Sequence, residues 1–173
     1  MADMLVKLYS LPELAPPLAH LKTLGIAIRQ ADPDEKHTLA RWVRKHFQDS
    51  WALGCEVALE QRPISCYIAI EQQPASTADS NPYDLPTERL IGFACYDVAS
   101  KGMFGPIGVH EAYRGRGVGT ALLLACLYAM KTDRYAYAVI GWAGPVEFYA
   151  KAAGATLISD SEPGIFHGPL AGA

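Results

Sequence analysis

The chain has 173 residues, of which 50% are hydrophobic and 19% charged, and its formal net charge is −3. This composition is typical of one globular domain of ordinary size with a proper core, and it excludes an intrinsically disordered chain. The slightly acidic balance provides no basic surface for nucleic acid or for an anionic membrane.

Cysteines are spread over the chain, without a Cys-x-x-Cys pair and without ligand-like histidine spacing. They are Cys55, Cys66, Cys95 and Cys126. Each lies in an apolar segment, which favours buried, reduced thiols and predicts no metal site. Residues 1–9 lack the long apolar region of a signal peptide, and the longest apolar helix is too short to span a bilayer. We therefore expect a cytoplasmic protein with no membrane and no nucleic-acid partner.

Two strands and two helices are predicted in the first part of the chain. Alternation over residues 4–9 and 25–29 predicts short strands, whereas the prolines within residues 11–19 predict an irregular connection. A helix begins at Asp32, with acidic residues in its first turn, where the helix dipole favours them. Its apolar face is formed by Leu39, Trp42, Val43 and Phe47. A second helix covers residues 50–61.

Three strands follow. Residues 65–71 alternate, so that one face carries Cys66, Ile68 and Ile70 and the other Tyr67 and Ala69. Residues 72–88 are rich in proline and small polar residues, which predicts a long loop, an insertion or a lid. Strands over residues 89–97 and 103–109 are joined by a Ser-Lys-Gly hairpin turn. Pro106 predicts a local break in strand pairing, because proline has no N–H to donate.

The segment Gly108-Val-His-Glu-Ala-Tyr-Arg-Gly-Arg-Gly-Val-Gly-Thr120 joins this strand to an almost wholly apolar helix over residues 118–130. Glycines let the backbone take positive φ, and a helix that begins at such a turn offers unpaired N–H groups and the positive end of its dipole. These features predict a site for phosphate or pyrophosphate. The segment is not a P-loop, because no lysine precedes Thr120, and it is not a dinucleotide-binding loop, because Thr120 replaces the last glycine.

The remaining elements repeat a strand–helix pattern. The apolar helix is expected to cross between parallel strands, and residues 135–142 form the matching strand. A helix begins at Gly144-Pro145 and ends at Gly154. Residues 155–159 and 165–170 are expected to be extended.

Two motifs resemble those of one enzyme family. The pattern Arg114-x-x-Gly117-x-Gly119 resembles the acetyl-CoA-binding motif of the GNAT superfamily of N-acetyltransferases. The sequence Phe-Tyr-Ala-Lys-Ala-Ala-Gly-Ala at residues 148–155 is similar to the family's Tyr-x-Lys-x-Gly segment after the fifth strand. The clear resemblance covers residues 90–158.

The resemblance implies an α/β protein with the GNAT fold, in which a central mixed sheet of about six to seven strands is splayed between strands 4 and 5 and flanked by about four helices. The family's first strand matches residues 25–29. Residues 1–24 are then an N-terminal extension, and residues 25–173 form a single acetyltransferase domain. The extension packs either on a neighbouring subunit of a homodimer or on its own domain.

The resemblance also implies transfer of the acetyl group of acetyl-CoA to a primary amine, by direct attack in a ternary complex. Backbone amides and side chains of one loop would hold the CoA pyrophosphate: Arg114, Gly115, Arg116, Gly117, Val118, Gly119 and Thr120. A bulge at Pro106 would admit the pantetheine arm. The amide that polarises the thioester carbonyl would belong to Ile107, Gly108 or Val109.

Tyr149 occupies the position of the family's general acid, and a phenol with a pKa of about 10 can give its proton to a departing thiolate. The general base is not defined by the motifs, because residues 103–109 contain no acidic side chain. His110 has a suitable ordinary pKa. Asp97 and Tyr96 are alternatives, as is a water relayed by several groups.

The acceptor is a small-molecule or peptide amine that no motif identifies. By their place in the family, Trp51, Glu56 and Glu60 are candidate substrate contacts, as is Asp97; core packing for Trp51 and a solvated surface for the two glutamates are the alternatives. Acidic residues at Glu56, Glu60 and Asp84 would suit a cationic amine. Trp142 replaces an asparagine that contacts the CoA arm in many relatives. A non-catalytic acyl-CoA sensor is the alternative to an enzyme, because no base is evident.

Overall fold

The computed structural model describes residues 1–72 and 88–165. A seven-stranded mixed sheet has the strand order β2-β3-β4-β5-β6-β1-β7. The strands are β1 (Met4–Lys7), β2 (Ile26–Gln30), β3 (Cys66–Gln72), β4 (Glu88–Tyr96), β5 (Met103–Val109), β6 (Tyr137–Ile140) and β7 (Thr156–Leu157). The α-helices are α1 (Ala15–Thr23), α2 (Lys36–His46), α3 (Asp49–Glu60), α4 (Val118–Thr132) and α5 (Val146–Ala153). The predicted α/β class with a mixed sheet is confirmed, with one α-helix more than expected.

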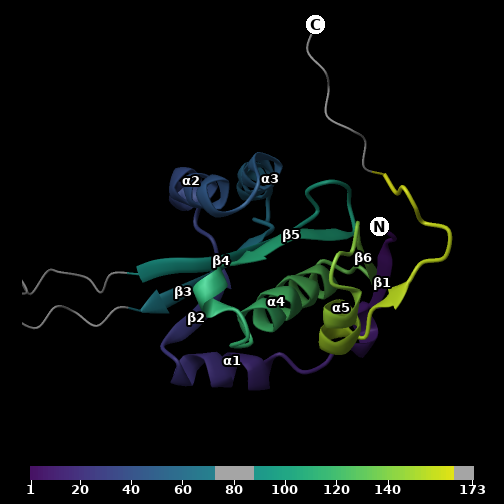
Figure 1. Cartoon of the computed structure of the whole chain (residues 1–173), viewed down its shortest axis with the longest axis horizontal. Helices are drawn as coiled ribbons and strands as arrows, with labels where there is room; N and C mark the ends of the chain where they lie inside the picture. The colour runs from purple at the N-terminus through teal and green to yellow at the C-terminus, as the bar shows by residue number, and fades with distance from the viewer. Residues whose placement is uncertain (73–87, 166–173) are drawn as a thin grey trace, which may run out of the picture.

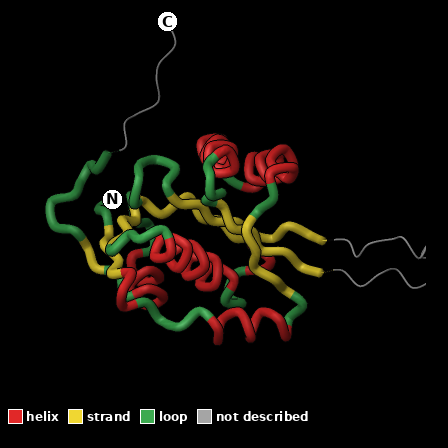
Figure 2. Tube along the Cα trace, turned by 180° about the vertical axis from the view of Figure 1, so that it is seen from behind, coloured by secondary structure: helices red, strands yellow, loops and turns green. Residues whose placement is uncertain are grey.

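The sheet lies between two helical layers (Figures 1 and 2). Helices α2 and α3 cover one face, whereas α1, α4 and α5 cover the other. Helix α4 is buried on almost every side, which explains why its sequence is apolar all round. The alternation predicted for β3 is confirmed, because Ile68 and Ile70 pack under α2 and α3 while Tyr67 and Ala69 pack against the α4 side.

The N-terminal strand is part of this sheet. Strand β1 pairs antiparallel with β6, Met4 opposite Ile140, and with β7, Met4 opposite Leu157. Residues 4–7 therefore pack on their own chain. The strand is shorter than predicted, because residues 8–10 form a 3₁₀ turn.

Residues 11–14 are irregular as predicted, but helix α1 begins at Ala15, so the prediction of an irregular connection is wrong for residues 15–19. Pro16 and Pro17 lie in the first turn of the helix. A proline's missing N–H costs nothing there, because the first N–H groups of a helix have no partner within it. Pro16 and Pro17 therefore mark the start of a helix, not a segment without a helix.

The predicted break at Pro106 is confirmed. Strand β5 pairs with β4 along most of its length but with β6 only at Met103 and Phe104. Gly105 has a φ of +121°, a conformation that side chains disfavour. Beyond Phe104 the two parallel strands are no longer hydrogen-bonded to each other, so the sheet is open between β5 and β6.

Several predictions concern residues that lie outside the described part of the structure. Residues 73–87, the interior of the predicted loop or lid with Asp84, lie outside the described residues, as do residues 166–173 of the last extended piece. Within residues 1–72 and 88–165, no helix is long and apolar enough to cross a membrane.

Candidate active site

The glycine-rich loop between β5 and α4 is built for close approach of a ligand to the backbone. Gly115 and Gly117 have φ of +76° and +87°, and Gly117 is the N-cap of α4. No Cβ stands in front of the first amides of α4 at these positions, and the positive end of the helix dipole faces the same way. The backbone of the loop therefore has the geometry that the predicted anion site requires.

A hollow of 590 Å³ opens over this loop. Its lining includes Arg114, Gly119 and Thr120 from the loop and the start of α4, Phe148 and Lys151 from α5, and Pro12 and Glu13 from the N-terminal segment. Lys151 belongs to the motif of residues 148–155, but its place beside the loop was not predicted.

The two predicted arginines are placed differently. The Arg114 side chain donates from Nε to the carbonyl oxygen of Val109 at 3.1 Å and lines the hollow. The Arg116 guanidinium lies 5.0 Å from the centre of the Tyr113 ring, and this residue does not line the hollow. Arg114 is thus the loop arginine whose charge faces the anion site.

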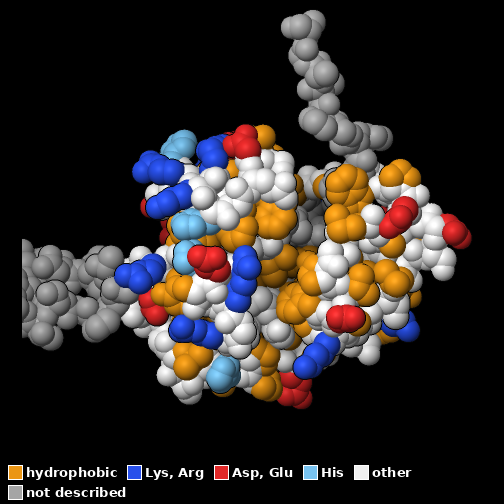
Figure 3. All heavy atoms as spheres, in the orientation of Figure 1, with side chains coloured by type: hydrophobic (Ala, Val, Ile, Leu, Met, Phe, Trp, Pro, Cys, Tyr) orange, Lys and Arg blue, Asp and Glu red, His pale blue; other side chains and the backbone are white. Residues whose placement is uncertain are grey.

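A second, larger groove of 830 Å³ runs from the same loop into the opening between β5 and β6. Both hollows are lined by Val109, Arg114, Gly119 and Phe148, so they lie next to each other. Figure 3 shows this side of the molecule hollowed, with hydrophobic side chains around the depression. The arrangement gives a long ligand a path from the surface loop to the middle of the sheet.

Tyr149 lines this groove from α5 and is only 6% exposed. Its ring lies edge-on to Phe104, with ring centres 6.4 Å apart, and edge-on to Phe148. Burial raises the pKa of the Tyr149 hydroxyl above its ordinary value. The phenol therefore keeps its proton at neutral pH, as a general acid requires.

The strand segment of Ile107, Gly108 and Val109 lines the same groove. His110 donates its backbone N–H to Ile91 at 2.9 Å. Because N–H directions alternate along an antiparallel strand, the Gly108 amide faces β4, whereas the amides of Ile107 and Val109 face the opening. Gly108 has a packing role, since a Cβ there would lie 2.7 Å from the Phe47 ring.

His110 is placed away from both hollows. Its Nδ1 accepts a hydrogen bond from the Ala112 amide at 3.3 Å and caps the short 3₁₀ turn Glu111–Tyr113. The ring lies 4.8 Å from the ring of His46 and lines neither hollow.

Asp97 holds the β4–β5 hairpin together. It is 8% exposed and has a φ of +59°. Its carboxylate accepts from the Gly102 amide at 2.7 Å, from the Tyr135 hydroxyl at 2.8 Å and from the Lys101 ammonium at 3.2 Å. The Asp97 carboxylate thus takes part in hydrogen bonds that stabilise the hairpin, and Asp97 lines neither hollow.

The candidate substrate contacts on α3 separate into two groups. Trp51 lines the larger groove and stacks on Phe47, with ring centres 5.6 Å apart. Glu60 pairs with Lys36, and Glu56 lies 3.6 Å from Arg44; neither glutamate lines the groove.

Trp142 lines the groove opposite α3, from the turn after β6. Its φ of +47° is unusual for a bulky residue. The Asp3 carboxylate accepts a hydrogen bond from the Trp142 amide at 2.9 Å, and the Trp142 indole donates to the carbonyl oxygen of Pro163 at 2.5 Å. The N-terminal segment therefore supports a groove wall, a contact that no local motif could reveal.

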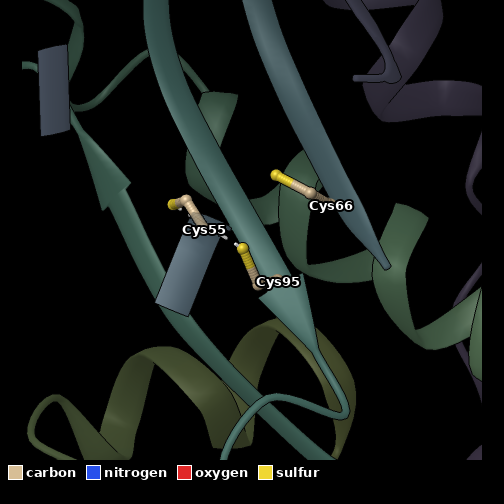
Figure 4. Close-up of side chains that lie close together, drawn as sticks. All are labelled: Cys55, Cys66 and Cys95. Carbon is tan, nitrogen blue, oxygen red and sulfur yellow. Dashed lines mark hydrogen bonds between the residues drawn. The ribbon is translucent and has the colours of Figure 1, made fainter. Parts of the chain in front are cut away.

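The cysteines are buried and free, as predicted. The fold brings three of them together, Cys55, Cys66 and Cys95, with sulfur atoms within 4.8 Å of one another (Figure 4). Such thiols could contact a soft metal ion, but among the described residues no fourth ligand joins the group, and structural zinc sites use four. Within the cluster, burial raises the pKa of the Cys95 thiol, whereas hydrogen bonds from Cys66 and Cys95 lower the pKa of the Cys55 thiol to about 5.

Residues 37–155 match the model of the Acetyltransferase (GNAT) family, and the chain belongs to this family. Among curated protein sequences, none matches the chain.

Solved structures share the fold. One is a GCN5-related glucosamine N-acetyltransferase region in a fungal multi-domain GH3 β-N-acetylglucosaminidase, with a TM-score of 0.68 at 13% identity over 91% of this chain. Another is a Drosophila protein, with a TM-score of 0.55 at 13% identity over 91% of this chain. This chain spans 19% of the fungal protein and 47% of the Drosophila protein. At these identities the likeness shows the GNAT fold.

Proposed function

We propose that the protein is an N-acetyltransferase that moves the acetyl group of acetyl-CoA to a primary amine by direct attack in a ternary complex. One observation carries the proposal: the glycine-rich loop and the buried phenol of Tyr149 line two neighbouring hollows that share Val109, Arg114, Gly119 and Phe148. A long thioester with a pyrophosphate at one end and a reactive carbonyl at the other fits that arrangement.

The loop residues fit the phosphate end of acetyl-CoA. The positive φ of Gly115 and Gly117 leaves the first amides of α4 open to an anion. The side chains of Arg114 and Lys151 add positive charge at the same hollow. Arg116, stacked on Tyr113, contributes at longer range.

The opening between β5 and β6 fits the pantetheine arm. The amides of Ile107 and Val109 face this opening, and Val109 also lines the hollow over the loop. An N–H of this pair is therefore placed to donate to the thioester carbonyl, on which negative charge develops during attack. Gly108, whose amide faces β4, is less suited to this role.

Tyr149 would protonate the sulfur that leaves. The phenol is buried, protonated and on the wall of the groove, so it needs no further activation. No carboxylate or imidazole lines the groove among the described residues, and the amine proton would then pass to water.

Thermal unfolding with and without acetyl-CoA, followed by release of free CoA across an amine panel, tests the proposal. We expect acetyl-CoA to raise the melting temperature and some amine to release CoA. Stabilisation without release from any amine would favour a non-catalytic acyl-CoA sensor. The absence of any stabilisation would refute both functions.

A further inference from the structure

The acceptor end of the groove is defined here by lining residues that do not also line the hollow over the loop: Phe47, Gln48, Ser50, Trp51, Val98 and Trp142. Among the described residues that line the groove, the only charged side chain is Arg114, at the opposite end. The acids expected to attract a cation, Glu56 and Glu60, face elsewhere and are paired with Arg44 and Lys36.

Aromatic rings form the walls of this end. Phe47 and Trp51 stack with an angle of 25° between their planes, and Trp142 lines the groove from the turn after β6. Ser50 and Gln48 are the polar side chains of the acceptor end, at the start of α3. Aromatic walls of this kind favour a flat, apolar ligand through stacking and edge-on contacts.

A positively charged amine would be poorly held here. An ammonium taken from water into an apolar groove without a carboxylate partner loses its hydration and gains no ion pair. An alkyl ammonium with a pKa of about 10.4 is neutral in only about one molecule in a thousand near pH 7.4. A groove whose described lining includes no base therefore selects an amine that is already uncharged in water.

We propose that the acceptor is a weakly basic aromatic amine, with its nitrogen attached directly to a ring. This inference rests on the proposed function and names its substrate class. The ring lies between Trp51 and Trp142, and the nitrogen points towards Tyr149 and the opening between β5 and β6.

The transfer balances without a protein base. The nitrogen lone pair forms the C–N bond to the acetyl carbon of acetyl-CoA, and the C–S bond breaks with its electrons on sulfur. Tyr149 gives its proton to that sulfur. The nitrogen gives its extra proton to water, and Tyr149 regains a proton from solvent.

Two amines of similar size and shape but different charge test the inference. p-Toluidine is uncharged at neutral pH, whereas benzylamine is protonated. We expect kcat/KM for p-toluidine to exceed that for benzylamine by about tenfold, because p-toluidine is almost wholly uncharged, while the greater nucleophilicity of neutral benzylamine offsets part of its small neutral fraction. We also expect the p-toluidine rate to be constant between about pH 6.5 and 9, because Tyr149 stays protonated throughout.

Variants of α3 test whether the acceptor binds at Trp51. Trp51→Ala should raise the KM for p-toluidine about tenfold, with Trp51→Phe restoring most of it and the KM for acetyl-CoA unchanged. Leu53→Ala is the matched control, because Leu53 is on the same helix, is 52% exposed and does not line the groove. Ser50→Asp adds a carboxylate to the groove in the first turn of α3, where an acid suits the helix dipole, and should improve the use of benzylamine.

The outcomes are separable. Acetyl-CoA binding with faster turnover of benzylamine or a diamine than of p-toluidine would overturn the inference and leave the proposed function intact. An acidic limb in the p-toluidine profile near the ordinary pKa of histidine would show a protein base and overturn it as well. Failure of acetyl-CoA to bind would refute the proposed function itself.

Discussion

The loop before α4 and the acceptor end of the groove are built from different parts of the chain: the loop offers backbone amides, and the acceptor end offers side chains. The loop is made from consecutive residues, and its backbone amides present the charge, with φ of +76° at Gly115 and +87° at Gly117. The acceptor end is made from side chains of α3, of the β4–β5 hairpin and of the turn after β6. The backbone-built site suits a ligand shared by a whole family, whereas the side-chain-built site can change without disturbing it.

The largest expected effect lies where the two regions meet. Tyr149→Phe removes the proton donor and keeps the ring against Phe104. We expect kcat to fall by about a hundredfold or more, the usual contribution of a general acid, with little change in acetyl-CoA affinity. Steady-state kinetics and binding calorimetry measure the two quantities, and unchanged kcat would remove Tyr149 as the acid.

A change of loop backbone comes next. Gly117→Ala forces a side chain into the left-handed conformation, which costs about 1–2 kcal/mol, and crowds the anion site. We expect acetyl-CoA affinity to fall about tenfold. Gly25→Ala is the control, because Gly25 has a similar φ of +70°, lies before β2 and lines neither hollow. Equal loss of affinity in both variants would mean that strain alone, and not the loop, sets binding.

The two loop arginines sharpen the comparison. Arg114→Gln should weaken acetyl-CoA binding about fivefold, since the guanidinium lines both hollows and an exposed charge contributes up to about 1 kcal/mol. Arg116→Gln should weaken it less, because that side chain lies on Tyr113. Binding at low and high salt measures both, and a larger loss for Arg116 would contradict the assignment.

The smallest expected effect is on the acceptor side. Asp3→Ala removes the acceptor of the Trp142 amide and lets the turn after β6 relax. We expect the KM for the amine to rise about threefold, the loss of about one net hydrogen bond spread over a flexible turn, while the KM for acetyl-CoA stays constant. A change confined to acetyl-CoA would show that the turn serves the loop instead.

The sequence allowed the loop and the break at Pro106 to be predicted because each depends on neighbouring residues and on local backbone chemistry, whereas Tyr149 was assigned through the family resemblance. The acceptor end could not be predicted, since Phe47, Val98 and Trp142 meet only through the tertiary fold. Asp97 illustrates the opposite error. Its place at the end of a strand made it a candidate base and substrate contact, but its carboxylate accepts hydrogen bonds from the Gly102 amide and the Tyr135 hydroxyl. The helix α1 was missed because its prolines favour a helix start only when the following residues continue it.

The place of β1 between β6 and β7 also affects how the molecule reaches this structure. Met4 pairs with residues 140 and 157, so one end of the sheet closes only when segments far apart in sequence meet. Such non-local pairing is slow, because the entropy of closing a long loop is lost before any contact compensates. The half of the sheet beneath α2 and α3 has antiparallel neighbours, β3 with β4 and β4 with β5. We therefore expect that half to form first during folding, and the half that carries Trp142 to form last.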